Sequence, residues 1–217
     1  MYASTGVIRL ATDAGTWVLP PHRAAWVPSG VSHLAHVVGR AAMRTLYFPS
    51  EIELLDRQTC VLNVTRLVRE LVLHLLKIAP LKVDDPRATS FIDVLRSLLD
   101  ELPEAPLQLP TPPTASAARL ASILASAPGD PTTIDELARQ AGASRRSLER
   151  AFRAETTMTI GQWRQRLRLI VAPERLADGQ PVGRIAAELG YSTQSSFGAM
   201  FKTQLGVAPS AYFATPS

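Results

Sequence analysis

Two segments in the second half of the chain repeat one another, and this repeat restricts the fold more than any other feature. Residues 137–144 (LARQAGAS) match residues 185–192 (IAAELGYS) at an offset of 48. Two large apolar positions further on match at an offset of 49: Leu148 and Phe152 against Phe197 and Phe201. A small Ala lets one helix approach the next, Gly supplies a left-handed turn, Ser caps the second helix, and the apolar residues anchor it. The pattern predicts a helix-turn-helix motif that occurs twice.

The residues around the repeat predict an all-helical C-terminal domain. Seven helical segments are expected, at 115–127, 133–141, 144–155, 159–178, 181–189, 192–205 and a final turn at 209–213. Thr159 and Gln162 form a capping box for the fourth of them. With about 20 residues at about 1.5 Å each, this connector helix would span about 30 Å. Successive major-groove faces of B-DNA lie about 34 Å apart, so one chain can place both recognition helices in adjacent grooves.

The surplus of positive charge lies entirely in this half. Residues 1–113 hold 11 Lys and Arg against 11 Asp and Glu, whereas residues 114–217 hold 12 against 8. The window 145–168 contains seven arginines and two glutamates, a local charge of +5. A basic stretch of this kind is typical of nucleic-acid binding. Because 20 of the 23 basic residues are arginine, a coding preference of the genome is an alternative explanation.

The first half has a different pattern. Short strands are expected at 6–12, 16–19, 24–27, 33–38 and 43–48, and helices at about 61–79 and 89–102. Five prolines within eleven residues, from Pro103 to Pro113, exclude a helix and predict an extended linker. The expected fold class is multidomain α+β. It comprises a small β domain at 1–50, a helical dimerisation or linker region at 51–113 with the Pro-rich boundary, and an all-α domain at 114–217.

Composition indicates a globular, soluble protein in a reducing compartment. Hydrophobic residues make up 46% of the chain and charged residues 19%, and no apolar run approaches the about 18 residues of a membrane span. The single Cys60 cannot close an intramolecular disulfide, and the first residues lack the pattern of a signal peptide. We therefore expect a cytoplasmic protein without a membrane partner.

The second half resembles the AraC/XylS family of bacterial transcription regulators. The resemblance rests on 134–155, the connector residues 161–165 (GQWRQ), 186–192 (AAELGYS), Phe197, Phe201-Lys202, 205–209 (LGVAP) and Tyr212. The first half resembles family members with an N-terminal cupin sensor, through 15–28 (GTWVLPPHRAAWVP) and 43–48 (MRTLYF). The resemblance implies a sequence-specific, effector-responsive transcription regulator that binds double-stranded DNA. RNA polymerase, a small-molecule effector and a second copy in a homodimer are the further partners it implies.

The two recognition helices supply the expected DNA-binding residues. On the first they are Arg145, Arg146, Ser147, Glu149, Arg150 and Arg153, and on the second Thr193, Gln194, Ser195, Ser196, Ala199 and Lys202. Arg can fork onto guanine, Glu can accept from cytosine N4, and Gln can bond adenine. We predict base contacts for Arg146, Glu149 and Arg150, with Arg145 and Arg153 nearer phosphates. Solvated charges on an ordinary exposed face are the alternative.

Three features depart from the family pattern. Thr157 stands where members usually carry Gly, so we expect a strained left-handed helix end there or a different end. Pro173 lies inside the connector helix and should kink it, or stop it near Ala172. The strands that bear the first cupin motif in related proteins would precede Met1, so the sensor domain is expected to be truncated.

A small-molecule effector would bind in the cupin-like domain. Trp17, Trp26 and His33 are the candidate effector-binding residues, with core packing or a surface histidine as the alternatives. His33 and His36 would point to opposite faces of a strand, so we predict neither a metal site nor a cofactor. A metal-dependent cupin enzyme is the alternative function, and it requires a ligand cluster that the sequence does not show. A protein-interaction adaptor that does not bind DNA is the third hypothesis.

Overall fold

The computed structural model describes residues 1–52, 54–80 and 85–213. Over these residues the chain forms six strands, eight α-helices and a short 3-10 helix. It divides into two compact units, one made of Met1–Leu10 and Val18–Ala105 and the other of Ala11–Trp17 and Pro106–Ser217. The predicted multidomain α+β class, with strands first and helices after, is confirmed.

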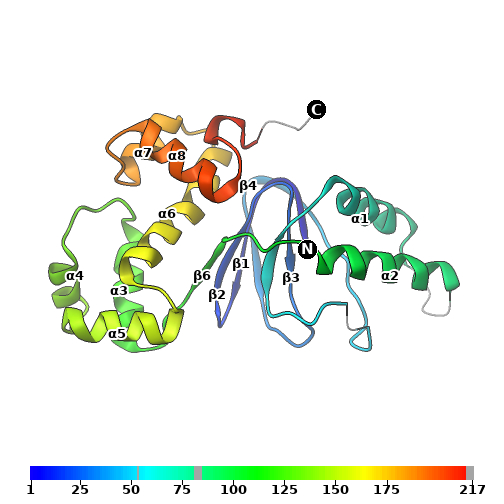
Figure 1. Ribbon diagram of the computed structural model, residues 1–217, viewed down its shortest axis with the longest axis horizontal. Helices are drawn as coiled ribbons and strands as arrows, with labels where there is room; N and C mark the ends of the chain where they lie inside the picture. The colour runs from blue at the N-terminus through cyan, green and yellow to red at the C-terminus, as the bar shows by residue number, and fades with distance from the viewer. Residues whose placement is uncertain (53, 81–84, 214–217) are drawn as a thin grey trace. The chain divides into compact units, whose positions relative to one another are not determined.

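The strands form a curved antiparallel sheet (Figure 1). Their bounds are β1 Tyr2–Thr12, β2 Gly15–Leu19, β3 Arg23–Trp26, β4 Leu34–Arg44, β5 Cys60–Asn63 and β6 Gln108–Pro110. The order is β5-β3-β1-β2-β6, and β4 pairs with β1. Residues of β1 and β2 such as Val7, Ile8 and Leu19 are fully buried. Because the consecutive residues Val7 and Ile8 point to opposite faces of β1, the sheet is covered on both faces at this position.

The structure differs from the predicted strands and linker in three places. Cys60–Asn63 is the strand β5, although the sequence predicts a helix over about 61–79; a short apolar run does not distinguish a buried strand from a buried helix. The predicted strand at 43–48 does not form separately, because its first two residues are the end of β4. Leu46 and Phe48 lie after that strand and pack against the apolar cluster that contains Val68 and Leu95. The strand β6 lies inside the predicted linker, at the edge of the sheet, where proline is tolerated.

Two helices complete the first unit, α1 Arg66–Ile78 and α2 Pro86–Asp100, and they lie together in Figure 1. The Thr65 hydroxyl accepts from the Val68 amide and so caps α1, which begins later than predicted because β5 takes the preceding residues. Val68 and Leu75 of α1 face Leu95 and Leu99 of α2 in one apolar cluster. Val68 and Leu75 lie two helical turns apart, and Leu95 and Leu99 one turn apart, so each pair lies on one face of its helix.

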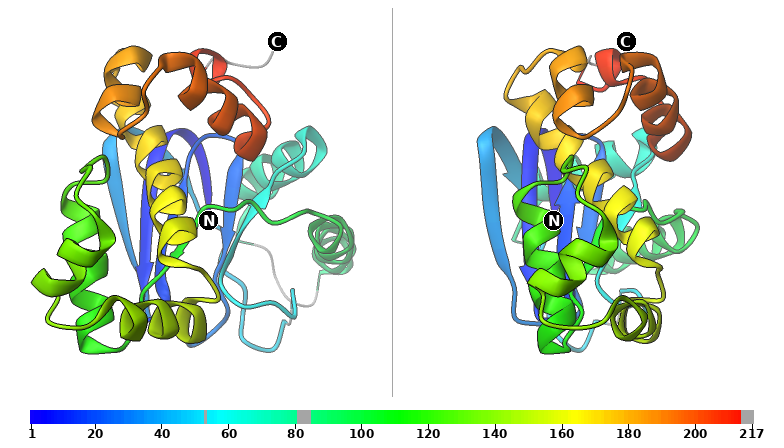
Figure 2. Two further views of the ribbon diagram at one scale, coloured as in Figure 1. Left: turned by 60° about the vertical axis from the view of Figure 1, so that its left-hand side comes forward. Right: turned by 90° about the vertical axis from the view of Figure 1, so that its left-hand side faces the viewer.

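The second unit contains the predicted helices almost residue for residue. They are α3 Ala115–Ser126, α4 Ile134–Gln140, α5 Arg145–Thr156, α6 Ile160–Ala177, α7 Val182–Glu188, α8 Gln194–Leu205 and the 3-10 turn Pro209–Ala211. Both views of Figure 2 show α6 running from the group α3 to α5 toward the pair α7 and α8. The sequence prediction of two helix-turn-helix motifs joined by a connector helix is confirmed.

The two unusual residues of this unit behave differently. Thr157 ends α5 in the left-handed conformation, with φ of 59° and ψ of 10°, as the strained alternative predicts. Pro173 does not stop the connector near Ala172, because α6 continues as one helix to Ala177. The missing N–H of Pro173 leaves the Leu169 carbonyl without its usual partner inside this helix.

Candidate nucleic-acid interface

The first motif presents α5 through a set of local features that the sequence encodes. Gly142 has a φ of +73°, which makes the left-handed turn between α4 and α5. The Ser144 hydroxyl then accepts from the Ser147 amide at 3.2 Å and caps α5. Leu148 and Phe152 have no exposed surface and fix the helix on the core of the motif. The opposite face of α5 is therefore held outward.

Three arginines occupy that outward face. Arg146, Arg150 and Arg153 are all exposed, at spacings of four and three residues that bring them to one side of the helix. Ser147 lies beside them, and its hydroxyl is 2.9 Å from that of Ser144, so it already serves the helix cap. This face offers three exposed cations to an approaching anion.

Two further predicted DNA contacts are engaged with each other. The Nε of Arg145 donates to Glu149 at 2.8 Å, and its Nη1 donates to Asp135 of α4 at 3.1 Å. The hydrogen bonds that Arg145 donates to Glu149 and, next in size, to Asp135 raise the pKa of Arg145. All three side chains are about half exposed, so solvent screens the pairs. Arg145 could meet a phosphate, or Glu149 a cytosine, only after this arrangement opens.

The second motif presents a less charged face. The Thr193 hydroxyl accepts from the Ser196 amide at 3.0 Å and caps α8, one residue after Ser192, which the repeat predicted as the cap. Thr193 and Ser196, both predicted DNA contacts, therefore take part in the cap. Phe197, Phe201 and Leu205 are buried beneath the helix. The outward positions are Gln194, Ser195, Ala199 and Lys202, all exposed. This helix offers one cation, Lys202, and otherwise neutral groups.

The connector is attached to the first motif by a tryptophan. Trp163 is buried, and its ring meets the Phe152 ring edge-on with 5.7 Å between centroids. Its Nε1 donates to the Pro110 carbonyl of β6 at 2.9 Å. Trp163 therefore packs the connector against the first motif. Its bond to β6 was not predicted, because the Pro-rich segment gives no local signal of a strand.

Three arginines of the basic window belong to α6 instead of a recognition helix. Arg164, Arg166 and Arg168 are each half-buried. Burial lowers the pKa of Arg164 and of Arg166, and the neighbouring Arg168 adds to the effect at Arg164. The Nε of Arg168 donates to the Pro128 carbonyl at 3.0 Å. Because these three arginines are partly buried on α6, they are less available to DNA than the exposed arginines of α5.

The first unit contains a cavity of about 1030 Å³. Trp26 and His33 line it, whereas Trp17 is buried and is not among its lining residues. His33 is exposed, and its Nδ1 lies 3.0 Å from the Val31 carbonyl oxygen. Of the three predicted effector-binding residues, two therefore lie at one cavity.

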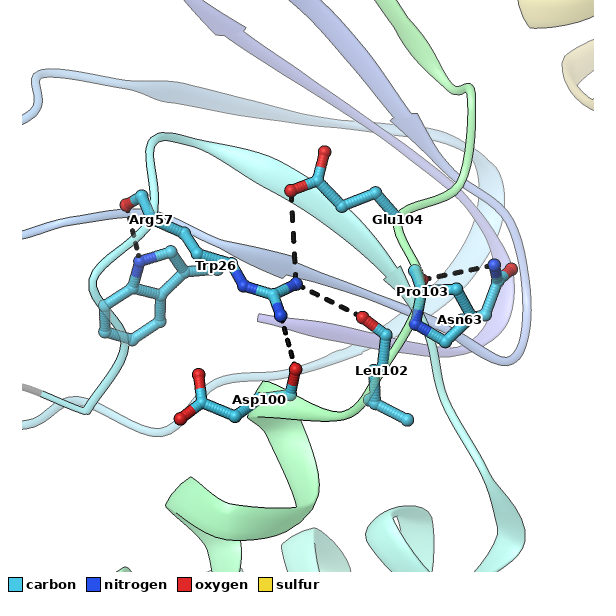
Figure 3. Close-up of polar contacts among 7 residues, drawn as sticks. All are labelled: Trp26, Arg57, Asn63, Asp100, Leu102, Pro103 and Glu104. Atoms are coloured by element: carbon cyan, nitrogen blue, oxygen red, sulfur yellow. Dashed lines mark hydrogen bonds and ion pairs between the residues drawn. The ribbon is translucent and has the colours of Figure 1, made fainter.

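An arginine ties one wall of this cavity to the end of α2 (Figure 3). The Trp26 Nε1 donates to the Arg57 carbonyl at 3.1 Å. The Arg57 guanidinium donates to the carbonyls of Asp100 at 2.5 Å and Leu102 at 3.2 Å, and it lies 4.0 Å from the Glu104 carboxylate. The sequence contains no signal for Arg57, because the carbonyls that its guanidinium binds are more than 40 residues away.

The described residues show no metal centre and no span of a membrane. Within 1–52, 54–80 and 85–213, no three His, Cys, Asp or Glu side chains are grouped so that they could hold an ion. No helix in that part of the chain is long and apolar enough to cross a bilayer.

The geometry defines a class of protein: two helix-turn-helix motifs on one connector helix, with basic or polar outward faces. A family model described as "Helix-turn-helix domain" matches residues 137–215. The transcriptional regulator NimR of Escherichia coli K12 is 31% identical over 209 residues, which cover 96% of this chain and 77% of that protein. The transcriptional regulator RipA of Corynebacterium glutamicum is 33% identical over 120 residues, 55% of this chain and 35% of RipA. A structure of fatty acid-bound ToxT from Vibrio cholerae aligns with a TM-score of 0.45 and 10% identity, over 98% of this chain and 84% of that one.

The chain belongs to the AraC/XylS family of transcription regulators. It is accordingly a DNA-binding regulator of transcription, as the repeat and the charge of its second half predicted.

Proposed function

We propose that the chain recognises its operator by placing α5 and α8 in successive major grooves. The single observation that carries this proposal is the outward face of α5, where Arg146, Arg150 and Arg153 are exposed together on a helix anchored by Phe152. The connector α6 has 18 residues and so spans about 27 Å, close to the about 34 Å repeat of the major groove.

The two helices would divide the recognition. Arg146 and Arg150 can fork onto guanines, and Arg153 lies further along the helix, where it can meet phosphate. Arg145 and Glu149 join this set once their ion pair opens on contact with DNA. On α8, Gln194 can bond adenine, Ala199 can touch a thymine methyl, and Ser195 and Lys202 can meet base edges and phosphate, while Thr193 and Ser196 hold the cap.

The first part of the chain would act as the sensor. We assign residues 1–50 to the effector-binding domain, 51–113 to the dimerisation and linker region and 114–217 to the DNA-binding domain. The cavity lined by Trp26 and His33 is the proposed effector site, and Trp17, which is buried and does not line this cavity, is assigned to core packing. An effector should raise the melting temperature of the wild-type chain but not of Trp26→Ala; an equal rise in both would exclude this cavity.

Dimerisation is proposed through α1 and α2. Leu67, Ile78 and Val94 are large apolar side chains that stay exposed, Leu67 with 62% of its surface. Leu67→Glu should then convert a dimer to a monomer in light scattering, and a wild-type monomer would refute the assignment. A regulator of this kind would act in the cytoplasm and recruit or exclude RNA polymerase at a promoter.

The central test is selection of duplexes from a random pool with the purified chain, followed by titrations at several salt concentrations. Contacts to phosphate predict that log affinity falls with log salt at a slope of about −0.9 per contact. Arg146→Ala should weaken binding, whereas Arg139→Ala, an exposed arginine on α4 outside both recognition helices, should not. Failure to enrich any duplex, or equal losses in the two variants, would overturn the proposed interface.

A further inference from the structure

The two helix-turn-helix motifs meet directly, apart from their link through α6. The loop 127–133 between α3 and α4 lies against the turn 189–193 between α7 and α8, and we call this the loop contact. A Cβ on Gly129 would lie 2.2 Å from the Glu188 carbonyl oxygen, and one on Gly190 would lie 2.8 Å from the Gly129 oxygen. Neither position can carry a side chain without separating the two loops. Gly190 also has a φ of +74°, which favours glycine for its own reason.

Arg168 of α6 joins both sides of the loop contact. Its Nε donates to the Pro128 carbonyl at 3.0 Å, and its guanidinium carbon lies 5.5 Å from the centre of the Tyr191 ring. The Tyr191 ring in turn meets the ring of Phe197, the buried anchor of α8, at 5.4 Å. One side chain therefore connects the first motif, the connector and the second recognition helix.

The connector by itself is a weaker guide for the second motif. Pro173 lies between Arg168 and α7 and supplies no N–H to the helix, so α6 lacks one of its bonds there. The missing hydrogen bond would permit α6 to bend at Pro173, and a second attachment between the motifs restricts this bending. The loop contact supplies that attachment, since Gly129 of the first motif lies directly against Glu188 and Gly190 of the second.

We propose that Arg168 is a positioning residue for operator recognition. Through its contacts with Pro128 and Tyr191 it holds α5 and α8 at a fixed distance and orientation relative to one another. The protein would then select the spacing of two half-sites as well as their sequence. This inference rests on the proposed function, in which both helices contact DNA. A direct phosphate contact by Arg168 is the competing role. The two roles differ in what they change, because a phosphate contact affects every duplex equally and a positioning residue affects spacing.

The experiment uses the full chain and a duplex selected from a random pool by the wild type. One base pair is inserted between the half-sites, which moves the second by about 3.4 Å along the axis and about 34° around it. We expect the wild type to lose more than about tenfold in affinity, since contacts of about 1.4 kcal/mol or more are withdrawn. Arg168→Ala and Arg168→Lys should lose less than about threefold in affinity, because α5 and α8 can then move relative to one another and α8 can reach the displaced half-site. Gln165→Ala, an exposed position on the same helix, should match the wild type.

A second measurement gives the distance between the two motifs in the absence of DNA. Spin labels on cysteines introduced at Gln140 of α4 and Thr203 of α8, both exposed, give the distance distribution between the motifs, and the native Cys60 is buried. The distribution should be narrow in the wild-type background and broader with Arg168→Ala. Gly129→Ala tests the same contact independently and should shift the distance, since its Cβ separates the loops.

The outcomes are distinguishable. A spacing penalty that is relaxed in both Arg168 variants, with affinity for a single half-site unchanged within about twofold, supports the positioning role. A uniform loss on all duplexes, single half-sites included, with recovery in Arg168→Lys, would identify a phosphate contact and overturn it. An equal spacing penalty in wild type and Arg168→Ala would overturn the positioning role alone. Absence of any duplex binding by the wild type would overturn the proposed function and this inference together.

Discussion

Replacing Pro173 tests whether the connector helix stores strain. Proline in a helix interior costs about 3 kcal/mol relative to alanine. Against this, Pro173 is buried, and alanine removes two methylene groups worth about 0.8 kcal/mol each. The more flexible unfolded chain of the alanine variant costs a further 0.4–1 kcal/mol, approximately. Pro173→Ala should therefore raise the free energy of unfolding by about 0.5–1 kcal/mol.

Thermal unfolding followed by far-UV circular dichroism measures this gain. In a chain of this size about 1 kcal/mol corresponds to about 2–4 °C, so a gain of about 0.5–1 kcal/mol should raise the melting temperature by about 1–4 °C. Pro181→Ala is the matched control, because Pro181 is exposed and precedes α7 instead of interrupting a helix. An unchanged or lowered melting temperature in Pro173→Ala would refute the idea of a strained connector.

Three other predictions concern single residues. Thr157→Gly should stabilise the protein by up to about 1 kcal/mol and Gly206→Thr should destabilise it by about 1–2 kcal/mol, because both positions are left-handed; melting curves of the pair would show opposite shifts. Arg150→Ala should reduce affinity for a selected duplex more than Gln194→Ala, since Arg150 adds charge to a base contact, and equal losses in a titration would contradict this ranking. Burial raises the pKa of the Cys60 thiol to about 11, so at neutral pH a thiol reagent should modify it only in denaturant; modification of the native protein at the rate of a free thiol would be inconsistent with that burial.

The helix-turn-helix motifs were predictable because their signals are local. Gly142 and Gly190 both have positive φ, and Ser144 caps the helix that follows. Each of these residues determines the conformation within a few positions of itself. The repeat therefore predicted the number and order of the helices in the second unit and the outward face of α5.

The errors share a different physical cause. The strand β5 forms because β3 is available to pair with it, from Arg23 against Asn63 to Trp26 against Cys60, and no residue within 60–63 records that partner. The strand β6 likewise depends on Gly15, where a Cβ would lie 2.5 Å from the Leu109 oxygen. A pairing between residues about 95 positions apart cannot be derived from proline content, which predicts only an extended chain.

At the candidate site too, contacts between distant residues could not be predicted from the sequence. The window 145–168 contains seven arginines, and these differ in their surroundings in the structure. Arg146, Arg150 and Arg153 are exposed on α5, Arg145 is paired with two carboxylates, and Arg164, Arg166 and Arg168 are half-buried on α6.

The spacing of the α6 arginines gives no indication of this division. Arg164 and Arg168 are four residues apart, as Arg146 and Arg150 are, so both pairs would share one helix face. The two pairs differ in what packs against them. The Pro128 carbonyl that Arg168 binds lies 40 residues earlier in the chain, so the local spacing gives no sign of it. A local charge of +5 therefore predicts that DNA is bound, but the residues that bind it are decided by contacts distant in the sequence.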